Sequence, residues 1–446
     1  MANNDVVPLL QQLIRNQCVN DGTKSSGNET RNAETLRAFL TEGASPDEEL
    51  IEPIAGRGSL IARIEGSDPS APSLCLMGHT DVVPANPDTW RNDPFGGEVI
   101  DGEVWGRGAV DMLNQTAAMA VAFRNLTRSG FKPKGTLVYL AAADEEAGGR
   151  NGVGALVEGH ADAVLTTYCL TEVGGMASRR ADGRTAIAVG AAEKGTAAVR
   201  LNVRGTAAHG SSPYGSDNAL VTASEVVRRI AGARGPGAIE ETWRGWVLAQ
   251  GYDDELTATL LDADRVWDAL PTMSPAMARN AHACTHLTAA PTMVTPGPAQ
   301  KINTIPDVIT IGVDVRTLPS QGEEETRAFI DEALGDLADR VTYDFPVPAI
   351  GGTTSPTGTP LWAAMEAAAR RTYPEAVLLP SMIAGATDAR YLRPRGVTTY
   401  GFGLLSTKIE AGRYWAMFHG KNERIDLESL DLSVDLWEGL SRDFLG

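Results

Sequence analysis

The stretch 74–111 constrains the fold of this chain more than any other part of it. It begins with the apolar run LCLM, which Gly78 closes, and such a run is typical of a buried strand. His79 and Asp81 follow at the tip of this strand, and residues two apart in extended backbone share a face. Asp81 can therefore accept one ring proton of His79 and leave the other ring nitrogen free to bind a metal ion.

Asp111 stands at a second position that suits a ligand. It follows a Gly-Arg-Gly turn and precedes an amphipathic run that includes Leu113, Ala117 and Val121. These features predict a junction between a strand and a helix, where α/β folds gather their ligands.

Two further apolar runs also end in carboxylates. The run TLVYLAAA leads into Glu145 and Glu146, and the run DAVLTTYCL leads into Glu172. Taken alone, each of these acids is more often a solvated turn residue. If the strands are neighbours in a parallel sheet, however, the acids and His79 meet at one edge, where only divalent metal ions would offset the repulsion. A pair of metal ions is the natural number for such a set.

The order of the predicted elements indicates two domains. Strands and helices alternate in the first part of the chain, which predicts an α/β fold with a mostly parallel sheet and helices on both faces. Further on, the order β-α-β-β-α-β predicts a smaller α+β domain with an open sheet. We predict a catalytic domain of residues 1–193 and 351–446, and a lid or dimerisation domain of residues 194–350. The segment 240–285 reads as an insertion in the smaller domain, and its tryptophans either line an acyl pocket or pack in a core or lid.

Composition excludes several classes of function. Lysine and arginine number 39 against 57 acids, and the net charge of −18 argues against binding to nucleic acid or to an anionic membrane. The N-terminal stretch has neither a basic region nor an uninterrupted apolar core, so we expect no signal peptide and no membrane span. The four cysteines form no Cys-x-x-Cys pair, which is typical of a cytoplasmic protein with free thiols.

The motifs resemble those of the M20 family of dinuclear zinc peptidases and aminoacylases. The matching pieces lie in family order over nearly the whole chain: GHTDVVP, WGRGAVDM, DEEAGG, TEVGG, GTAAHGSSP, KINTIPD, DVRTLP, GATDARYL and FHGKNERI. The resemblance implies a catalytic domain with an inserted smaller domain, and a homodimer.

The resemblance also implies a set of metal ligands. His79, Asp111 and Glu172 would bind one zinc ion, while the same aspartate, Glu146 and His419 would bind the other. Each ion then keeps room for a shared water molecule, as a catalytic zinc site requires. Cobalt or manganese could replace zinc, because sites of nitrogen and oxygen ligands follow metal availability as well as affinity.

Three further residues receive catalytic roles from the resemblance. Glu145 would act as general base and Asp81 would support His79. His209 would reach across the dimer and stabilise the oxyanion in the partner's site. Without the resemblance, a lone histidine in a polar loop such as His209 would be read as a surface residue.

Four residues resemble the substrate-binding positions of the family. Asn303 and Arg316 lie in the smaller domain, and the guanidinium fork of Arg316 suits a substrate carboxylate. A surface position at a strand end is the alternative for Arg316. Gly385 would allow a close approach of backbone to substrate, and Thr387 belongs to the loop that meets the substrate's carboxylate.

One departure from the family pattern bears on the subgroup. Many members continue after the bridging aspartate with Lys-Gly-Gly, whereas Asp111 is followed here by Met112, Leu113, Asn114 and Gln115. The ligand itself is intact. Together with the long insertion, this resembles the aminoacylase and carboxypeptidase-S-like branch more than the minimal peptidases.

The sequence therefore predicts a metal-dependent hydrolase that cleaves an amide bond in a small substrate with a free carboxylate. An N-acyl amino acid and a dipeptide are both compatible with it. A carbamoyl or amidine-type C–N hydrolase would use the same ligands, and a noncatalytic binding homologue would keep the same fold. Retention of Glu145 and of all the ligands argues against a noncatalytic protein.

Overall fold

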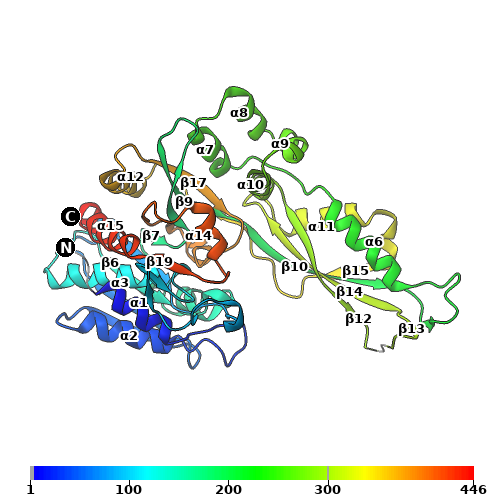
Figure 1. Cartoon of the computed structure of the whole chain (residues 1–446), viewed down its shortest axis with the longest axis horizontal. Coiled ribbons are helices and arrows are strands. Elements are labelled where there is room, and N and C mark those ends of the chain that lie inside the picture. The colour runs from blue at the N-terminus through cyan, green and yellow to red at the C-terminus, as the bar shows by residue number, and fades with distance from the viewer. Residues whose placement is uncertain (1–4, 299–300) are drawn as a thin grey trace.

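The computed structural model describes residues 5–298 and 301–446 of the chain. Figure 1 shows two units, a larger one that contains the first and last helices and a smaller, elongated one that extends to one side. The larger unit is built on a ten-stranded sheet and the smaller one on a four-stranded sheet.

The ten-stranded sheet has the order β1-β2-β6-β3-β7-β18-β9-β16, and β8 and β17 also pair with β9. Its strands are β1 (Asp47–Ile51), β2 (Ser59–Ile64), β3 (Leu74–His79), β6 (Leu137–Ala142), β7 (Tyr168–Thr171), β8 (Gly174–Arg179), β9 (Thr185–Glu193), β16 (Thr353–Thr354), β17 (Val377–Ile383) and β18 (Thr398–Gly401). The neighbours β6, β3, β7 and β18 run parallel to one another, and β1, β2 and β8 pair antiparallel. The prediction of a mostly parallel central sheet is thereby confirmed.

Helices cover both faces of this sheet, as predicted, and strand β3 shows why its apolar run is continuous. Leu76 lies in a core shared with α3 (Leu113–Arg128), whereas Met77 lies in a second core with α4 (Ala155–Gly159). Because successive side chains of a strand face opposite sides, a strand covered on both faces needs apolar residues at every position.

Three further helices pack on the core that contains Leu76: α1 (Val6–Arg15), α12 (Pro360–Thr372) and α15 (Leu427–Leu445). The apolar residues of α1 recur at helical spacing, which gives the helix one buried face. That face consists of Val6, Leu9, Leu10, Leu13 and Ile14. Helix α2 (Thr30–Thr41) contributes Leu36 and Leu40 to the same core.

The smaller unit is an antiparallel sheet of order β12-β14-β10-β15 with helices on one face. Its elements are β10 (Gly195–Arg204), α6 (Ala219–Gly232), β12 (Thr288–Pro296), β14 (Val308–Thr317), α11 (Glu323–Leu334) and β15 (Val341–Asp344). Buried residues alternate along β14, as expected for a strand that is covered on one face. The order of elements agrees with the order that the sequence predicts.

The segment 240–285 forms helices that lie at the top of the view in Figure 1, above the junction of the two units. They are α7 (Glu241–Gln250), α8 (Asp254–Leu260), α9 (Ala263–Ala269) and α10 (Pro275–Thr285). Trp243 is buried with Met382 of β17, donates from its indole nitrogen to the backbone oxygen of Leu260 at 2.7 Å, and stacks on Trp246. Trp243 therefore packs in a core between these helices and the larger sheet.

Two predicted strands differ from the observed ones. The first half of DAVLTTYCL forms the helical turn α5 (Ala161–Val164), because Val164 turns into the core beside α4, and the strand begins only at Tyr168. In the segment GFGL the strand ends at Gly401, and Phe402 and Leu404 instead pack in the core with α15.

Among the described residues, no helix combines the length and the apolar character that a membrane span requires.

Candidate metal centre

The parallel strands β3, β6 and β7 end at one edge of the larger sheet. His79 is the last residue of β3, while Glu145 and Glu146 lie just beyond β6 and Glu172 follows β7 directly. In the register of the sheet, His79 lies opposite Ala142 of β6. The side chains that follow these strands therefore meet, as carboxyl ends of parallel neighbours must.

Asp111 reaches the same edge from the turn before α3. The hydroxyl of Thr116, in the first turns of α3, donates to the backbone oxygen of His79 at 2.8 Å. This bond fixes the start of the helix against the tip of β3.

His79, Asp111 and Glu172 form the first cluster of donor atoms. The Nε2 atom of His79 lies 3.1 Å from Oδ1 of Asp111 and 3.7 Å from Oε2 of Glu172. All three side chains are buried.

Asp111, Glu146 and His419 form the second cluster. The Nε2 atom of His419 lies 3.2 Å from Oδ2 of Asp111 and 3.1 Å from Oε2 of Glu146. The two carboxylate oxygens of Asp111 thus face different histidines, which is the arrangement of a bridging ligand.

These separations fit a metal site. Donor atoms around a tetrahedral zinc ion with bonds of about 2.0 to 2.1 Å lie about 3.3 Å apart. The ligand sets given by the sequence resemblance have that spacing in both clusters.

Glu145 also lies at this centre. One of its carboxylate oxygens is within 4.8 Å of donor atoms of His79 and Glu172. A grouping by distance alone would therefore place Glu145 in the first cluster. Asp111 also lies 3.1 Å from His79, so distance alone admits both carboxylates to this cluster.

The charge of the centre also calls for cations. Oε1 of Glu146 and Oδ1 of Asp81 are buried, and within residues 5–298 and 301–446 they have no hydrogen-bond partner. Buried acceptors without partners are costly, and divalent ions at this position would offset the charge of the acids. Imidazole nitrogens and carboxylate oxygens are ligands that zinc, cobalt and manganese accept.

Glu145 and Glu172 hold protons more strongly than ordinary carboxyl groups in the metal-free chain. Burial, together with the charge of Glu172, raises the pKa of Glu145 well above its usual range. Burial also raises the pKa of Glu172 to about 7.

The two histidines are strong bases in the metal-free chain. Hydrogen bonds to Asp111 and Glu146 raise the pKa of His419 to about 10. Burial by itself lowers the pKa of His79, but hydrogen bonds to Asp111 and Glu172 outweigh it and raise the pKa well above the usual value. Both rings therefore hold their second proton more tightly than a free imidazole does, and a metal ion must displace that proton.

Asp81 lies behind His79, although the nearest acceptor is not its carboxylate. The Nδ1 atom of His79 is 3.0 Å from the backbone oxygen of Asp81 and 3.6 Å from Oδ1 of the side chain. Oδ2 of Asp81 accepts from the side-chain amide of Asn20 at 2.9 Å and from the backbone N–H of Glu146 at 3.1 Å. Asp81 thus ties the support of His79 to the turn that carries Glu146.

Glu423 is a supporting residue that sequence reasoning missed. Its buried carboxylate accepts from the backbone N–H groups of Gly108, Val110 and Asp111 at 3.1, 2.7 and 2.8 Å, and from Arg107 at 2.8 Å. The carboxylate therefore holds the loop that presents Asp111. It belongs to the matched segment FHGKNERI, but nothing in its spacing shows a contact with residues more than 300 positions away.

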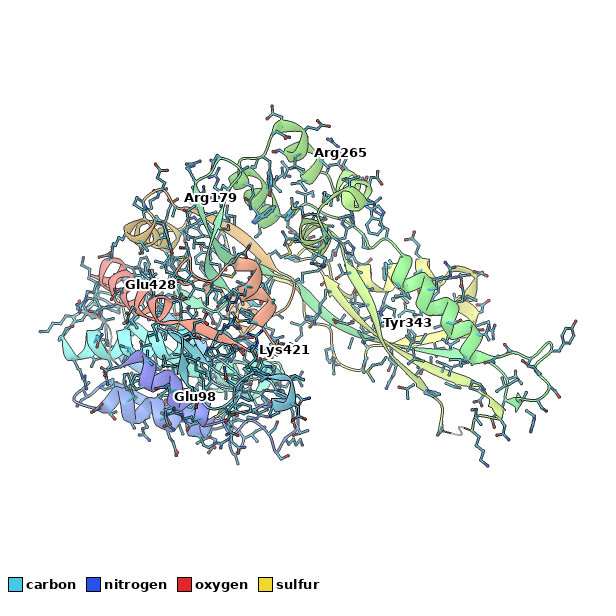
Figure 2. All side chains as sticks on the ribbon, viewed as in Figure 1. Glu98, Arg179, Arg265, Tyr343, Lys421 and Glu428 are labelled. Carbon is cyan, nitrogen blue, oxygen red and sulfur yellow. The ribbon has the colours of Figure 1, made fainter. Side chains whose placement is uncertain are left out.

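The centre is open on the side of His419. The side chain of His419 is 59% exposed, whereas that of Asp111 is 8% exposed. Figure 2 places Lys421, which follows this histidine, on the side of the larger unit that faces the smaller one. A substrate can therefore approach from that side.

His209 and Asn303 lie together at the far end of the smaller unit. His209 is in β11 (Ala208–His209), which pairs with β13 (Thr304–Ile305), and Figure 1 shows β13 far from the larger unit. The backbone N–H of Gly210 donates to the backbone oxygen of Asn303 at 2.7 Å. Within one chain, neither residue meets the metal ligands.

The remaining predicted substrate residues have other partners. Nε of Arg316 donates to Oδ1 of Asp314 at 3.0 Å. Thr387 is buried, and its backbone N–H and hydroxyl donate to Glu193 at 2.7 and 3.0 Å. Gly385 lies on the same loop. Among the residues that the structure describes, an added Cβ atom there would meet only Ile383, at 3.9 Å.

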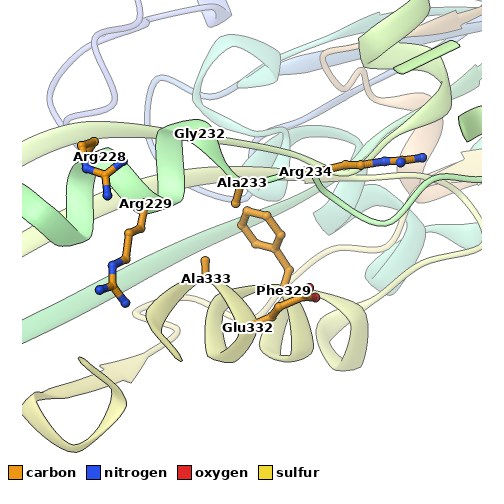
Figure 3. A pocket seen from close by; sticks show the side chains of 8 residues that line it. All are labelled: Arg228, Arg229, Gly232, Ala233, Arg234, Phe329, Glu332 and Ala333. Atoms are coloured by element: carbon orange, nitrogen blue, oxygen red, sulfur yellow. The ribbon is translucent and has the colours of Figure 1, made fainter. Parts of the chain in front are cut away.

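A hollow of about 330 Å³ lies between α6 and α11, remote from the ligands (Figure 3). Arg228 and Arg229 both contact Glu225, and Arg234 contacts Asp264. Because these arginines already have acidic partners, the hollow does not offer a free cationic site.

The model of "Peptidase family M20/M25/M40" matches residues 75–443. The N-fatty-acyl-amino acid synthase/hydrolase PM20D1 of Xenopus tropicalis is 26% identical over 399 residues, which cover 86% of this chain and 75% of that protein. The succinyl-diaminopimelate desuccinylase of Acinetobacter baumannii is 26% identical over 379 residues, which cover 84% of each.

Among solved structures, the M20 family metallo-carboxypeptidase Sso-CP2 from Sulfolobus solfataricus superposes with a TM-score of 0.73 at 17% identity. The superposition covers 99% of each chain, so the two share a fold over their full described length.

Proposed function

The chain belongs to peptidase family M20/M25/M40, and from this premise we propose that it hydrolyses the amide bond of an N-acyl amino acid or a dipeptide with a pair of metal ions. The observation that carries the proposal is the position of Asp111 between two histidines, at 3.1 and 3.2 Å. The five ligands come from distant parts of the chain, and their meeting at metal-ligand spacing is not needed for the fold alone.

Each ligand has a role in this proposal. His79 and Glu172 hold one ion, Glu146 and His419 hold the other, and Asp111 bridges them. Zinc is the metal we propose, because each ion has three protein ligands of nitrogen and oxygen and an open position. When bound, such a pair supplies polarisation of the substrate carbonyl and a more acidic water molecule.

Glu145 carries the proton in this proposal. It accepts the proton of the attacking water molecule and donates it to the leaving nitrogen. The free carboxylate beside the first cluster has the position that this role requires.

The names of the relatives support the substrate class. One acts on N-fatty-acyl-amino acids and another removes a succinyl group from diaminopimelate, so both cleave an acyl group from an amino acid nitrogen. We propose that Arg316 binds the substrate's carboxylate in place of Asp314, with Gly385 and Thr387 as further contacts from the same chain. Asn303, which lies beside His209, would contact the substrate in the site of a second copy.

We further propose that the protein works as a homodimer in the cytoplasm. The cysteines are buried and unpaired, as is usual in a reducing compartment. His209 is exposed and remote from the ligands of its own chain, which supports a role in the site of a second copy.

A substrate panel tests this function. Metal-free protein is loaded with zinc, cobalt or manganese and assayed on N-acetyl and long-chain N-acyl amino acids, dipeptides and carbamoyl compounds, with identification of the products. We expect the best substrate to be an N-acetyl amino acid, a long-chain N-acyl amino acid or a dipeptide. Protein treated with a chelator should be inactive. Cleavage of carbamoyl compounds alone would show the alternative C–N hydrolase. No cleavage with any metal would indicate a noncatalytic protein.

A further inference from the structure

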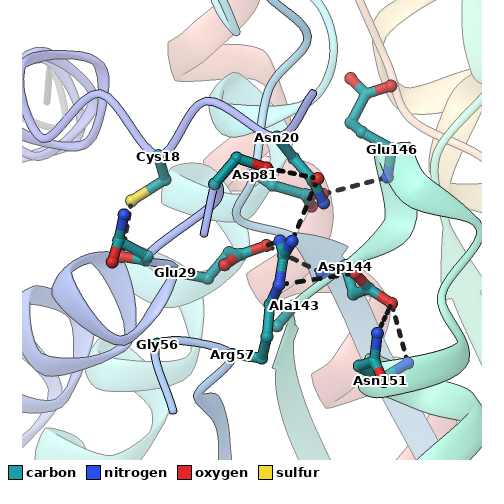
Figure 4. A network of polar contacts seen from close by, with 12 residues as sticks. Cys18, Asn20, Glu29, Gly56, Arg57, Asp81, Ala143, Asp144, Glu146 and Asn151 are labelled. Carbon is teal, nitrogen blue, oxygen red and sulfur yellow. Dashed lines mark hydrogen bonds and ion pairs between the residues drawn. The ribbon is translucent and has the colours of Figure 1, made fainter. Parts of the chain in front are cut away.

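A buried polar network lies behind the metal centre and has no part in the chemistry described so far (Figure 4). Its centre is Arg57, which is 4% exposed, and its closest partner is the fully buried Glu29. Nη1 of Arg57 donates to Oε1 of Glu29 at 2.5 Å. The guanidinium is the cation of this network, and the acids around it are Glu29, Asp81 and Asp144.

One arm of the network leads from Arg57 to Asp81 through Asn20. Nη2 of Arg57 donates to the amide oxygen of Asn20 at 3.2 Å, and the amide nitrogen of Asn20 donates to Oδ2 of Asp81 at 2.9 Å. Arginine can only donate and a carboxylate can only accept, so the two partners fix the orientation of the amide between them. The orientation of Asp81 therefore depends on Arg57.

A second arm leads from Arg57 to the turn before Glu145. Nε of Arg57 lies 3.6 Å from Oδ1 of Asp144, and the backbone N–H of Asp144 donates to Glu29 at 3.2 Å. Asp144 has a φ angle of 71°, in the left-handed region that residues with a side chain adopt rarely. The network supplies contacts that hold Asp144 in this conformation.

The two arms meet at the backbone of the next residues. Oδ2 of Asp81 also accepts from the backbone N–H of Glu146, so one carboxylate contacts both arms. Figure 4 shows the carboxylate of Glu146 pointing away from the network, and its Oε2 atom lies 3.1 Å from His419. The network thus bonds to the backbone of the turn 144–146. The carboxylate of Glu146 points from this turn toward the metal centre.

We propose that Arg57, together with Glu29 and Asn20, is a positioning unit for the metal centre. It acts through Asp81, which supports His79, and through Asp144, which directs Glu145 and Glu146. This role rests on the proposed function, because it concerns ligands and a base that serve hydrolysis. Outer contacts of this kind commonly change metal affinity or activity by about 10-fold to 100-fold.

The test compares Arg57→Met with wild type and with the matched control Arg37→Met. Arg37 is an arginine of the same N-terminal region, but its ion pair with Glu48 lies at the surface, with half of the Arg37 side chain exposed. Metal affinity is measured by competition with a chromophoric chelator, and kcat and KM are determined separately on folded protein. For Arg57→Met we expect a loss of about 10-fold to 100-fold in affinity for one ion or in kcat, with KM within about twofold. Arg37→Met should match wild type.

Two further variants separate positioning from folding. Asn20→Leu leaves the Arg57–Glu29 ion pair intact and removes the link from Arg57 to Asp81, together with the bonds that the Asn20 amide oxygen accepts from Gly22 and Ser26. It should therefore weaken metal binding or kcat even if Arg57→Met does not fold. Arg57→Lys keeps the positive charge but cannot contact Glu29, Asn20 and Asp144 together as the guanidinium does. Its metal affinity and kcat should lie between those of wild type and Arg57→Met.

The outcomes distinguish this inference from the proposed function. If wild type takes up two ions per chain and hydrolyses an amide, but folded Arg57→Met and Asn20→Leu keep its metal affinity and kcat, the positioning role is wrong. If wild type itself takes up no metal ion, the proposed function fails and the positioning role fails with it.

Discussion

Asp111 is the residue on which the centre depends, because its two oxygens face two different histidines. Glu145 lies beside this arrangement without belonging to the pairs that Asp111 makes.

Replacing Glu145 by glutamine should separate catalysis from metal binding. Glu145→Gln keeps the size of the side chain but removes its ability to accept a proton, so we expect kcat to fall by about 10²-fold to 10⁴-fold. Metal content measured by mass spectrometry should stay at two ions per chain. Glu146→Gln is the matched comparison, because it changes the neighbouring ligand and should lower metal content. Near-normal kcat in Glu145→Gln would contradict the assignment.

Metal uptake should release protons. In the metal-free chain hydrogen bonds raise the pKa of His419 to about 10, and zinc binds only the neutral ring. Below that pKa the proton competes with the metal, so apparent affinity should rise with pH between about 6 and 9. Calorimetry in buffers of different ionisation enthalpy should show protons released per ion bound. A binding enthalpy that is the same in all buffers would contradict this prediction.

At the residue scale, the sequence indicated which side chains meet at this edge of the sheet, because each one stands next to a recognisable strand end or motif. Arg57, Asn20 and Glu423 escaped prediction because their roles exist only through contacts with distant segments, and a single acid or arginine has no distinctive spacing. The sequence correctly predicted that Asp81 lies beside His79, but not which atom of Asp81 is nearest to the ring. The backbone oxygen of Asp81 lies 3.0 Å from Nδ1 of His79 and the carboxylate oxygen lies 3.6 Å away.

At the scale of elements, the connection between the two sheets is a single residue. Lys194 lies between the end of β9 and the start of β10. Its ammonium donates to the backbone oxygen of His286 at 2.7 Å and to the hydroxyl of Thr288 at 3.3 Å. Burial lowers the pKa of Lys194 from 10.5 to about 7.

This lysine should make stability depend on pH. Between about pH 7 and 10.5 the unfolded chain binds a proton that the folded chain does not, so stability from this group rises with pH. Below about pH 7 both states are protonated and the dependence ends. Lys194→Met lacks this titrating group and should not show the increase in stability. The urea concentration at the unfolding midpoint of wild type, relative to that of the variant, should therefore increase from pH 7 to pH 10. A constant difference between the two midpoints would show that Lys194 is charged in the folded protein.

Elements with a strong pattern were predictable and elements that depend on distant packing were not. The continuous apolar run of β3 and the helical spacing of α1 each allow one interpretation. The segment DAVLTTYCL is apolar enough for a strand, but Val164 finds its core as part of a helical turn. A short apolar run cannot distinguish these cases without its surroundings.

At the scale of the whole molecule, the smaller unit leaves an apolar surface uncovered. Leu220 and Val221 of α6 and Met293 and Val294 of β12 are each about half exposed or more, at 49, 65, 64 and 52%. β12 is also an edge of its sheet within the part of the chain that the structure describes. An edge strand beside exposed apolar side chains favours pairing with a second copy.

A mixing experiment tests whether His209 serves the partner's site. His209→Ala should lose an oxyanion donor and about 10²-fold to 10³-fold in kcat, and Glu145→Gln should be inactive for want of a base. After subunit exchange, a mixed dimer holds one site in which an intact Glu145 faces the intact His209 of the other variant. Half of the dimers are mixed and half of their sites are complete, so activity should recover to about a quarter of wild type. Recovery requires contact between copies, because neither variant carries both residues. A mixture that stays as inactive as its parts, although ultracentrifugation shows mixed dimers, would place the role of His209 outside catalysis.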